Sequence, residues 1–205
     1  MSLESKLPTV GTTIFTVMSR LAAEHGAINL SQGFPDFEPP ERLLELVESK
    51  LRGTTGPANQ YAPMAGLPAL REAIVRKVGE YYGRTVDADA DVTVTSGGTE
   101  ALFCAIQAVV RAGDEVLMLD PAYDSYEPAV LLAGGRPVHV PLQRPGFGVD
   151  WQRLREALTP KTRLLLLNFP HNPSGAVLSP ADLDTLAAIL RGTGTLVLAD
   201  EVYEH

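Results

Sequence analysis

From Asp91 onwards, short apolar segments alternate with longer segments of helical spacing, and this alternation is the strongest constraint on the fold. The short segments are typical of strands and the longer ones of helices. In sequence order the predicted strands are DVTVTS, EVLMLD, RPVHVPL, RLLLLN and TLVLAD. Because a helix is predicted between each strand and the next, the pattern favours a mostly parallel α/β sheet with right-handed crossovers.

The segment Leu164–Gly175, LLLLNFPHNPSG, indicates how such a sheet is buried and where it opens. Four consecutive leucines suit a strand that is covered on both faces. Pro170 and Pro173 cannot continue a hydrogen-bonded ladder, so the strand ends in a rigid polar loop. Ligands of open α/β sheets bind beyond the carboxyl ends of the strands. We therefore expect the other strand ends to face the same crevice.

Before Asp91 the sequence predicts three helices, over residues 12–24, 41–52 and 67–82, separated by segments rich in glycine and proline. The region before about residue 45 has little periodicity. We assign residues 1–45 to an N-terminal arm and part of a small domain. Residues 46–205 are assigned to the first part of a larger domain.

Composition excludes few functions but weighs against some partners. The chain has 205 residues and a formal net charge of −8, which disfavours nucleic acid and anionic membranes. No apolar run is long enough for a membrane span. The single cysteine, Cys104, rules out an intrachain disulfide and suits a reducing compartment, so we expect a cytoplasmic protein. Cys104 itself is predicted to be a small buried hydrophobe, and the four histidines lack the spacing of metal ligands, so no metal site is predicted.

The first predicted strand runs into Gly97, Gly98 and Thr99, which precede a helix. Backbone N–H groups at a helix N-terminus, beside glycines that allow close approach, suit a phosphate group. The alternative is a plain tight turn. The segment matches neither the GxGxxG dinucleotide fingerprint nor the GxxxxGKS phosphate loop, so a dinucleotide-binding domain is disfavoured.

Three further strand ends carry candidate side chains. Tyr123 could stack on a planar ligand, or could cap the core with its hydroxyl in water. Asp200 ends an apolar strand and needs a cation or a donor, unless it is a helix N-cap or a surface carboxylate. Tyr203 lies three residues later and would share a face with Asp200 if a helical turn begins there. Asn172 is restrained by Pro173, or is simply a turn residue.

Six motifs, taken in order, resemble the class I and II aminotransferases, which are fold-type-I enzymes that use pyridoxal 5′-phosphate (PLP). They are SQGFPDFEPP, NQYAPMAG, SGGTEAL, DPAYDSYEP, NFPHNPSG and ADEVYEH. The resemblance runs from about residue 10 to His205 and looks closest to the branch of kynurenine, glutamine and methionine aminotransferases. It implies a three-layer α/β/α PLP-transferase-like large domain with a mainly parallel sheet, incomplete in this chain.

The resemblance also implies roles for residues at the strand ends. Gly98 and Thr99 would offer backbone N–H groups to the PLP phosphate, and Tyr123 would stack on the pyridine ring. Asn172 and Tyr203 would donate hydrogen bonds to the phenolate oxygen of that ring.

Other implied roles concern catalysis, the substrate and a second subunit. Asp200 would pair with the pyridine nitrogen and keep it protonated, so Asp200 and Tyr203 are the catalytic candidates. Gly33, with Asn172, would lie beside the substrate. Tyr61 would reach the phosphate in the neighbouring subunit, which implies a homodimer with shared active sites.

The reaction implied by the resemblance moves an amino group to a 2-oxo acid from an amino acid such as methionine, glutamine, kynurenine or an aromatic one. Its Schiff-base lysine would follow the ADEVYEH motif, and none of Lys6, Lys50, Lys77 and Lys161 occupies a matching position. We therefore expect the N-terminal part of a longer polypeptide. The family's sheet has seven strands, of which the last two lie between the first and the fifth, so five strands would leave a gap. Alternatives are another reaction on this scaffold, such as a cysteine-conjugate β-lyase or a carbon–carbon bond-forming synthase, and a non-catalytic truncated PLP-fold protein.

Overall fold

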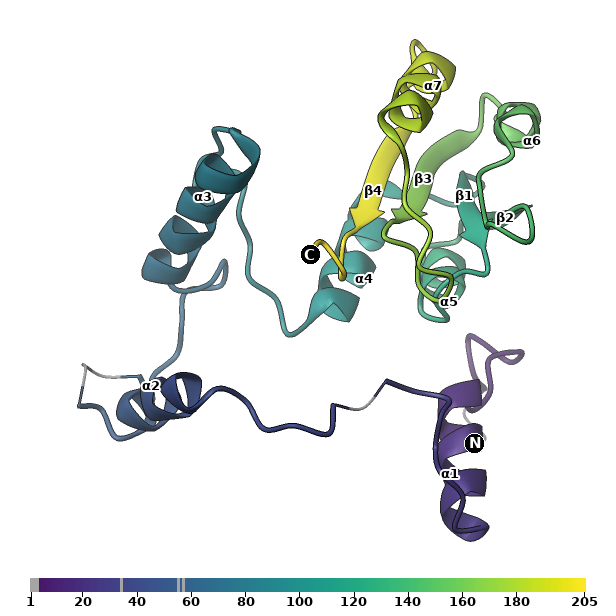
Figure 1. Ribbon diagram of the computed structural model, residues 1–205. Helices are drawn as coiled ribbons and strands as arrows, with labels where there is room; N and C mark the ends of the chain where they lie inside the picture. The colour runs from purple at the N-terminus through teal and green to yellow at the C-terminus, as the bar shows by residue number, and fades with distance from the viewer. Residues whose placement is uncertain (1–3, 34, 55, 57) are drawn as a thin grey trace. The chain divides into compact units, whose positions relative to one another are not determined.

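The computed structural model describes residues 4–33, 35–54, 56 and 58–205 (Figure 1). The chain divides into two compact units. The helical unit comprises Thr12–Thr95, and the sheet unit comprises Ser96–His205 together with the described residues before Thr12. The predicted boundary near residue 45 stays a prediction.

The helical unit contains α1 (Ile14–Glu24), α2 (Glu41–Leu51) and α3 (Pro68–Tyr82), which confirms the three helices predicted there. Local signals define their ends. The Thr13 side chain accepts a hydrogen bond from the backbone N–H of Thr16 and so caps α1. Helix α3 begins with a proline and is followed by Gly83, whose left-handed backbone conformation is common where a helix ends.

The segment Asp91–Ser96, predicted as the first strand, forms no strand. Its backbone is held by a loop of the helical unit instead, since the N–H of Val94 donates to the Ala65 carbonyl at 3.0 Å. Gly66 makes this approach possible, because a Cβ there would lie 2.6 Å from the Val94 side chain. A strand is stable only beside another strand that satisfies its backbone groups, and none of the described strands pairs with this segment. The prediction of five strands is therefore wrong by one.

The sheet unit is built from alternating helices and strands. They are α4 (Gly98–Val109), β1 (Glu115–Asp120), α5 (Tyr126–Leu132), β2 (Arg136–Pro141), α6 (Trp151–Ala157), β3 (Thr162–Asn168), α7 (Pro180–Leu190) and β4 (Leu196–Asp200). Among the described residues these strands form one four-stranded sheet of order β2-β1-β3-β4. Every pairing is parallel, as predicted. The carboxyl ends of the strands therefore lie along one edge.

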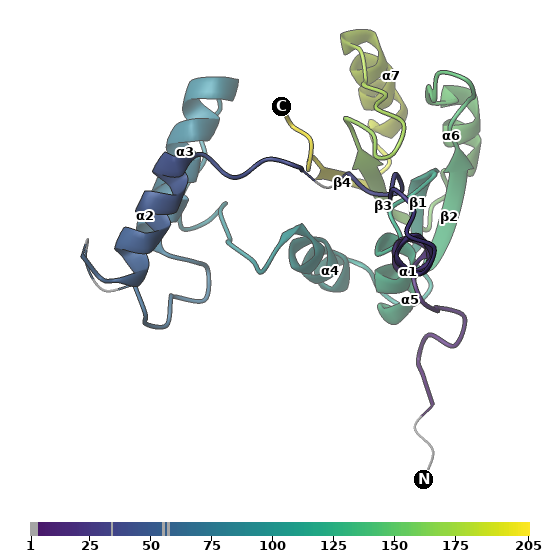
Figure 2. The ribbon, with the colours of Figure 1, turned by 60° about the horizontal axis from the view of Figure 1, so that its bottom comes forward.

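Helices cover both faces of this sheet, which gives the three-layer α/β/α architecture expected from the sequence (Figure 2). The first core layer joins α4 and α5 to the sheet and contains Leu164 and Leu166. The second core layer joins α6 and α7 to the sheet and contains Leu165 and Leu167. Successive strand residues point to opposite faces. The run of four leucines thus serves two separate cores, and its predicted burial on both faces is confirmed.

Cys104 corrects another prediction, because its side chain is exposed and not buried. Helix α4 buries Leu102 and Ile106, which lie four residues apart on one face. Cys104 stands midway between them and so points to the other side of the helix. No helix in the described part of the chain combines the length and the apolar character that crossing a membrane requires.

Candidate functional site

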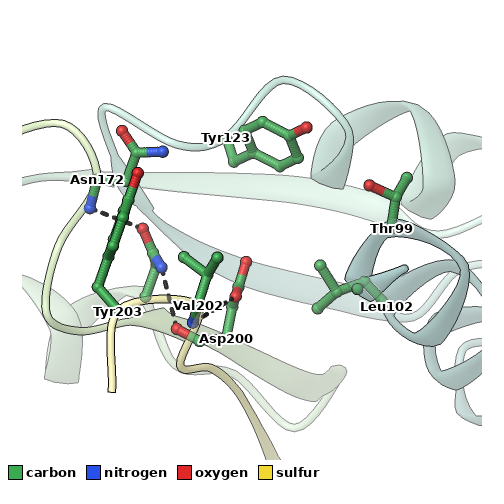
Figure 3. A pocket seen from close by; sticks show the side chains of 9 residues that line it. Thr99, Leu102, Tyr123, Asn172, Asp200, Val202 and Tyr203 are labelled. Carbon is green, nitrogen blue, oxygen red and sulfur yellow. Dashed lines mark hydrogen bonds between the residues drawn. The ribbon is translucent and has the colours of Figure 1, made fainter. Parts of the chain in front are cut away.

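A cavity of about 510 Å³ opens beyond the carboxyl ends of β3 and β4, within the sheet unit (Figure 3). Its lining comes from the start of α4 and from segments that follow β1, β3 and β4. The lining residues are Gly98, Thr99, Leu102, Tyr123, Asn168, Asn172, Asp200, Val202 and Tyr203. Six of these are residues that the sequence singled out. The structure therefore brings the candidates from four separate motifs together, while their roles toward a cofactor stay predictions.

Helix α4 provides one end of the cavity. The chain turns into the helix at Gly97, whose φ of +85° lies in the region that favours glycine. Apart from the adjoining backbone, no heavy atom would come within 4 Å of a Cβ at Gly97 or Gly98, so space is open around this turn. The first N–H groups of a helix have no partner within the helix and carry partial positive charge. Gly98 and Thr99 therefore present a site for an anionic group.

Asp200 is a half-buried carboxylate on the floor of the cavity, between the Thr99 end and the Tyr203 end (Figure 3). Its Oδ2 accepts a hydrogen bond from the Tyr126 hydroxyl at 2.5 Å. Its Oδ1 accepts a longer bond, 3.3 Å, from the Val202 backbone N–H. The carboxylate thus meets a donor, as its position at a strand end required, and it keeps capacity to accept from a ligand.

Tyr126 is a site residue that the sequence reasoning did not identify. It is only 3% exposed, and burial together with the neighbouring Asp200 raises the pKa of its phenol well above the ordinary value. The hydroxyl therefore stays protonated and donates. Its ring meets the ring of Tyr123 edge to face, with centroids 5.7 Å apart. The DPAYDSYEP motif contains both tyrosines, but the bond from Tyr126 to Asp200 joins residues 74 positions apart.

Asn168, also missed, ties two strand-end loops together. It is the last residue of β3 and pairs in register with Asp200 at the end of β4. Its side-chain Nδ2 donates to the Asp200 carbonyl at 3.0 Å. Its Oδ1 accepts from the backbone N–H of Asn172 at 2.9 Å. Asn168 is buried, so these two bonds fix the loop that places Asn172 at the cavity.

His171 links the same loop to the end of β1. Its Nε2 donates to the Pro121 carbonyl at 3.0 Å, and its Nδ1 lies 2.6 Å from the Ser174 hydroxyl. A carbonyl can only accept, so Nε2 carries the proton and neutral Nδ1 accepts from the serine. Burial lowers the pKa of His171 below its ordinary value, which favours this neutral form.

Tyr203 and Asn172 lie beside each other at the end of the cavity opposite Thr99 (Figure 3). The segment after Asp200 is a non-helical turn, so the helical turn considered for Asp200 and Tyr203 does not form, although both residues still line one cavity. Gly33 and Tyr61 belong to the helical unit, where both are exposed. Their roles toward substrate and phosphate stay predictions.

The cavity combines the features that suit a planar aromatic ligand with an anionic arm. Tyr123 offers a ring face or edge, Asp200 offers a carboxylate to a protonated ring nitrogen, and the start of α4 offers N–H groups to an anion. Among the described residues, no group of three or more histidine, cysteine or acidic side chains gathers closely enough to hold a metal ion.

Comparison with known proteins relates this arrangement to one enzyme family. Residues 25–205 match the family model described as "Aminotransferase class I and II". Methionine aminotransferase of Escherichia coli K12 is 55% identical over 203 residues, which cover 98% of this chain and 52% of that protein. Human kynurenine–oxoglutarate transaminase 1 is 39% identical over 196 residues, covering 90% of this chain and 46% of that protein. The chain spans about half the length of the curated relatives it matches.

Solved structures give the same result. The crystal structure of YbdL from Escherichia coli, identified there with a methionine aminotransferase function, has a TM-score of 0.93 and 54% identity, and covers 100% of this chain and 53% of that one. The structure of N-succinyldiaminopimelate aminotransferase from Mycobacterium tuberculosis has a TM-score of 0.92 and 43% identity, with the same coverage.

Proposed function

Because this chain belongs to the family of class I and II aminotransferases, we propose that the complete protein is a PLP-dependent aminotransferase. It would move an amino group from an amino acid to a 2-oxo acid. The single observation that carries the proposal is the cavity at the carboxyl edge of the sheet, where the start of α4, Tyr123 and Asp200 lie together.

The described residues fit this cofactor at three points. The N–H groups of Gly98 and Thr99 would hold the phosphate, and Tyr123 would contact the ring. The Asp200 carboxylate would accept a hydrogen bond from the protonated ring nitrogen. When bound, the cationic ring draws electrons away from the α-carbon of the amino acid substrate.

Asn172 and Tyr203 would orient the ring from the other side. Both line the cavity, and both carry donors that suit an anionic ring oxygen. Such donors fix the ring against rotation. Among the described residues no lysine lines the cavity, so the lysine that would hold the cofactor covalently and carry the α-proton is expected from the rest of the complete protein. Gly33 would lie by the substrate carboxylate.

Methionine, glutamine, kynurenine and aromatic amino acids are the proposed donors. Support comes from relatives named as methionine and kynurenine aminotransferases, of which the methionine enzyme shares 55% identity. A relative named as a probable N-succinyldiaminopimelate aminotransferase shares 44%, so the donor panel should include that compound.

The test uses protein from its complete reading frame. We expect a PLP chromophore, a borohydride-reduced label on one lysine peptide, and formation of a new amino acid from a supplied 2-oxo acid. A labelled lysine with release of pyruvate and ammonia, and without a new amino acid, would indicate a β-lyase instead. No chromophore and no label would overturn the proposal.

We further propose that the active unit is a homodimer in which Tyr61 completes the partner's phosphate site. The Tyr61 side chain is fully exposed, as a residue that acts in another subunit would be before assembly. Mixing an inactive Tyr61→Ala variant with an inactive Asp200→Ala variant should restore activity at one site in each mixed dimer. No recovery, despite subunit exchange shown by mass spectrometry, would contradict shared sites. The cytoplasmic location stays a prediction.

A further inference from the structure

Tyr126 makes contacts with two cavity residues at once. Its hydroxyl donates to Asp200 Oδ2 at 2.5 Å, and its ring packs edge to face on the ring of Tyr123. Tyr126 does not itself line the cavity. It therefore stands behind the two residues that would touch the ring of a bound cofactor.

The position of Tyr126 is fixed from several sides. It is the first residue of α5, and its backbone N–H donates to the Tyr123 carbonyl at 3.1 Å. Ala129 and Val130, on the same short helix, are buried in the first core layer together with the Tyr126 ring. A side chain held in this way can impose an orientation on a partner that is less constrained.

Asp200 is such a partner. It is half-buried at the end of β4, and two atoms of its carboxylate receive unequal bonds, 2.5 Å at Oδ2 and 3.3 Å at Oδ1. The bond from Asn168 reaches the backbone carbonyl of Asp200, so it holds the strand end but does not restrain rotation of the carboxylate. The bond from Tyr126 fixes the rotation of the carboxylate, and each oxygen keeps a lone pair that can accept from a ligand.

We propose that Tyr126 is a positioning residue that orients the Asp200 carboxylate toward the ring nitrogen of the bound cofactor. The inference rests on the proposed function. It adds a donor on α5, outside the cavity lining, whose effect on the cofactor passes through Asp200.

The test is Tyr126→Phe in protein from its complete reading frame, with cofactor removed and then titrated back. Phenylalanine keeps the buried ring and its contact with Tyr123 and removes only the hydroxyl. Two ligands are compared by fluorescence titration: PLP, and its carbocyclic analogue in which C–H replaces the ring nitrogen. A hydrogen bond to a charged group is worth enough to change affinity by about tenfold or more.

We expect Tyr126→Phe to weaken PLP binding about tenfold or more and to change binding of the analogue less than about twofold. In an Asp200→Ala background, Tyr126→Phe should make no further difference to PLP affinity. Thermal unfolding of the cofactor-free protein checks that each variant is folded.

Equal weakening of both ligands would mean that Tyr126 acts through packing against Tyr123, and would overturn the inference. Unchanged or tighter PLP binding in Tyr126→Phe would overturn it as well. If the unsubstituted protein binds neither ligand, the proposed function fails and this inference fails with it. The two failures are therefore distinguished by the unsubstituted protein alone.

Discussion

Asp200 shows how one residue of the cavity depends on partners from distant parts of the chain. Its carboxylate accepts from Tyr126, and its carbonyl accepts from Asn168. The strand ends could be predicted to meet, because parallel strands place their carboxyl ends along one edge. The two partners of Asp200 could not be predicted, because nothing in the local pattern shows which side chain contacts another across the sheet.

The first prediction concerns Asp200→Ala in the complete protein. Loss of the carboxylate removes the charge that stabilises a protonated ring, so kcat/KM for amino transfer should fall by about a hundredfold or more. The free energy of unfolding should fall by only about 1–3 kcal/mol, because the buried Tyr126 hydroxyl loses its acceptor. Steady-state kinetics and thermal unfolding measure the two effects. Asp184→Ala, at an exposed position on α7, is the matched control. Full activity in Asp200→Ala would contradict the mechanism.

The second prediction concerns the neutral, buried His171. In the folded state the pKa of His171 lies below 6.5. As the pH falls through about 6.5, the unfolded chain therefore binds a proton on this histidine before the folded chain does. The histidine's contribution to stability is therefore complete at higher pH and is lost as the pH falls. His171→Gln removes that titration and should flatten the loss of unfolding free energy between about pH 7.5 and 5.5. Urea titrations at both pH values measure it, and identical slopes in the two proteins would disprove it.

At the scale of single elements, α7 shows how a short sequence signal defines a helix. Ser179 Oγ accepts from the Asp182 backbone N–H at 3.2 Å, and the Asp182 side chain accepts from the Ser179 N–H at 2.9 Å. This reciprocal arrangement is a capping box, and Pro180 follows at the first helical position. The Trp151 indole N–H also donates to Asp182, so the cap connects α7 to α6.

The third prediction tests this cap. Ser179→Ala should lower the free energy of unfolding by about 1 kcal/mol, because a helix N–H loses its acceptor. Ser179→Thr keeps an acceptor at the same position and should recover most of the loss. Denaturant unfolding of the three proteins measures both changes. A Thr variant as unstable as the Ala variant would show that capping is not the cause.

The helices and four strands could be predicted because their signals are local. Ser179 with Pro180 begins a helix, Gly83 ends one, and four leucines in a row indicate a strand between two layers. The Asp91–Ser96 segment has a strand-like sequence but no partner among the described strands, and pairing is a property of the sheet. Cys104 was misjudged for a related reason, since apolar neighbours in sequence do not show which helix face is covered.

At the scale of the whole molecule, the sheet of the sheet unit separates two cores. The first core layer contains Ile106 of α4 and Val130 of α5, and the second contains Leu154 of α6 and Leu186 of α7. The backbone of the sheet lies between them. Side chains that do not share contacts, and that lie more than about 10 Å apart, contribute to stability nearly independently.

The fourth prediction follows from this separation. Ile106→Val should cost about 1 kcal/mol and Leu154→Ala about 2–5 kcal/mol, because each leaves a space in a packed core. The double variant should lose the sum of the two within about 0.5 kcal/mol. Urea unfolding provides the three values. Ile106→Val combined with Val130→Ala, within the first core layer, is the comparison pair and should depart further from the sum.

The alternation of Leu164–Leu167 between the two layers has a consequence for protein engineering. Each leucine packs against one set of helices only. Leu165 and Leu167 pack in the layer of α6 and α7, and Leu164 and Leu166 pack in the layer of α4 and α5. Libraries that repack one side of the sheet can therefore be selected separately from libraries for the other side. The sequences selected from the two libraries can then be combined in one gene without a second round of joint selection.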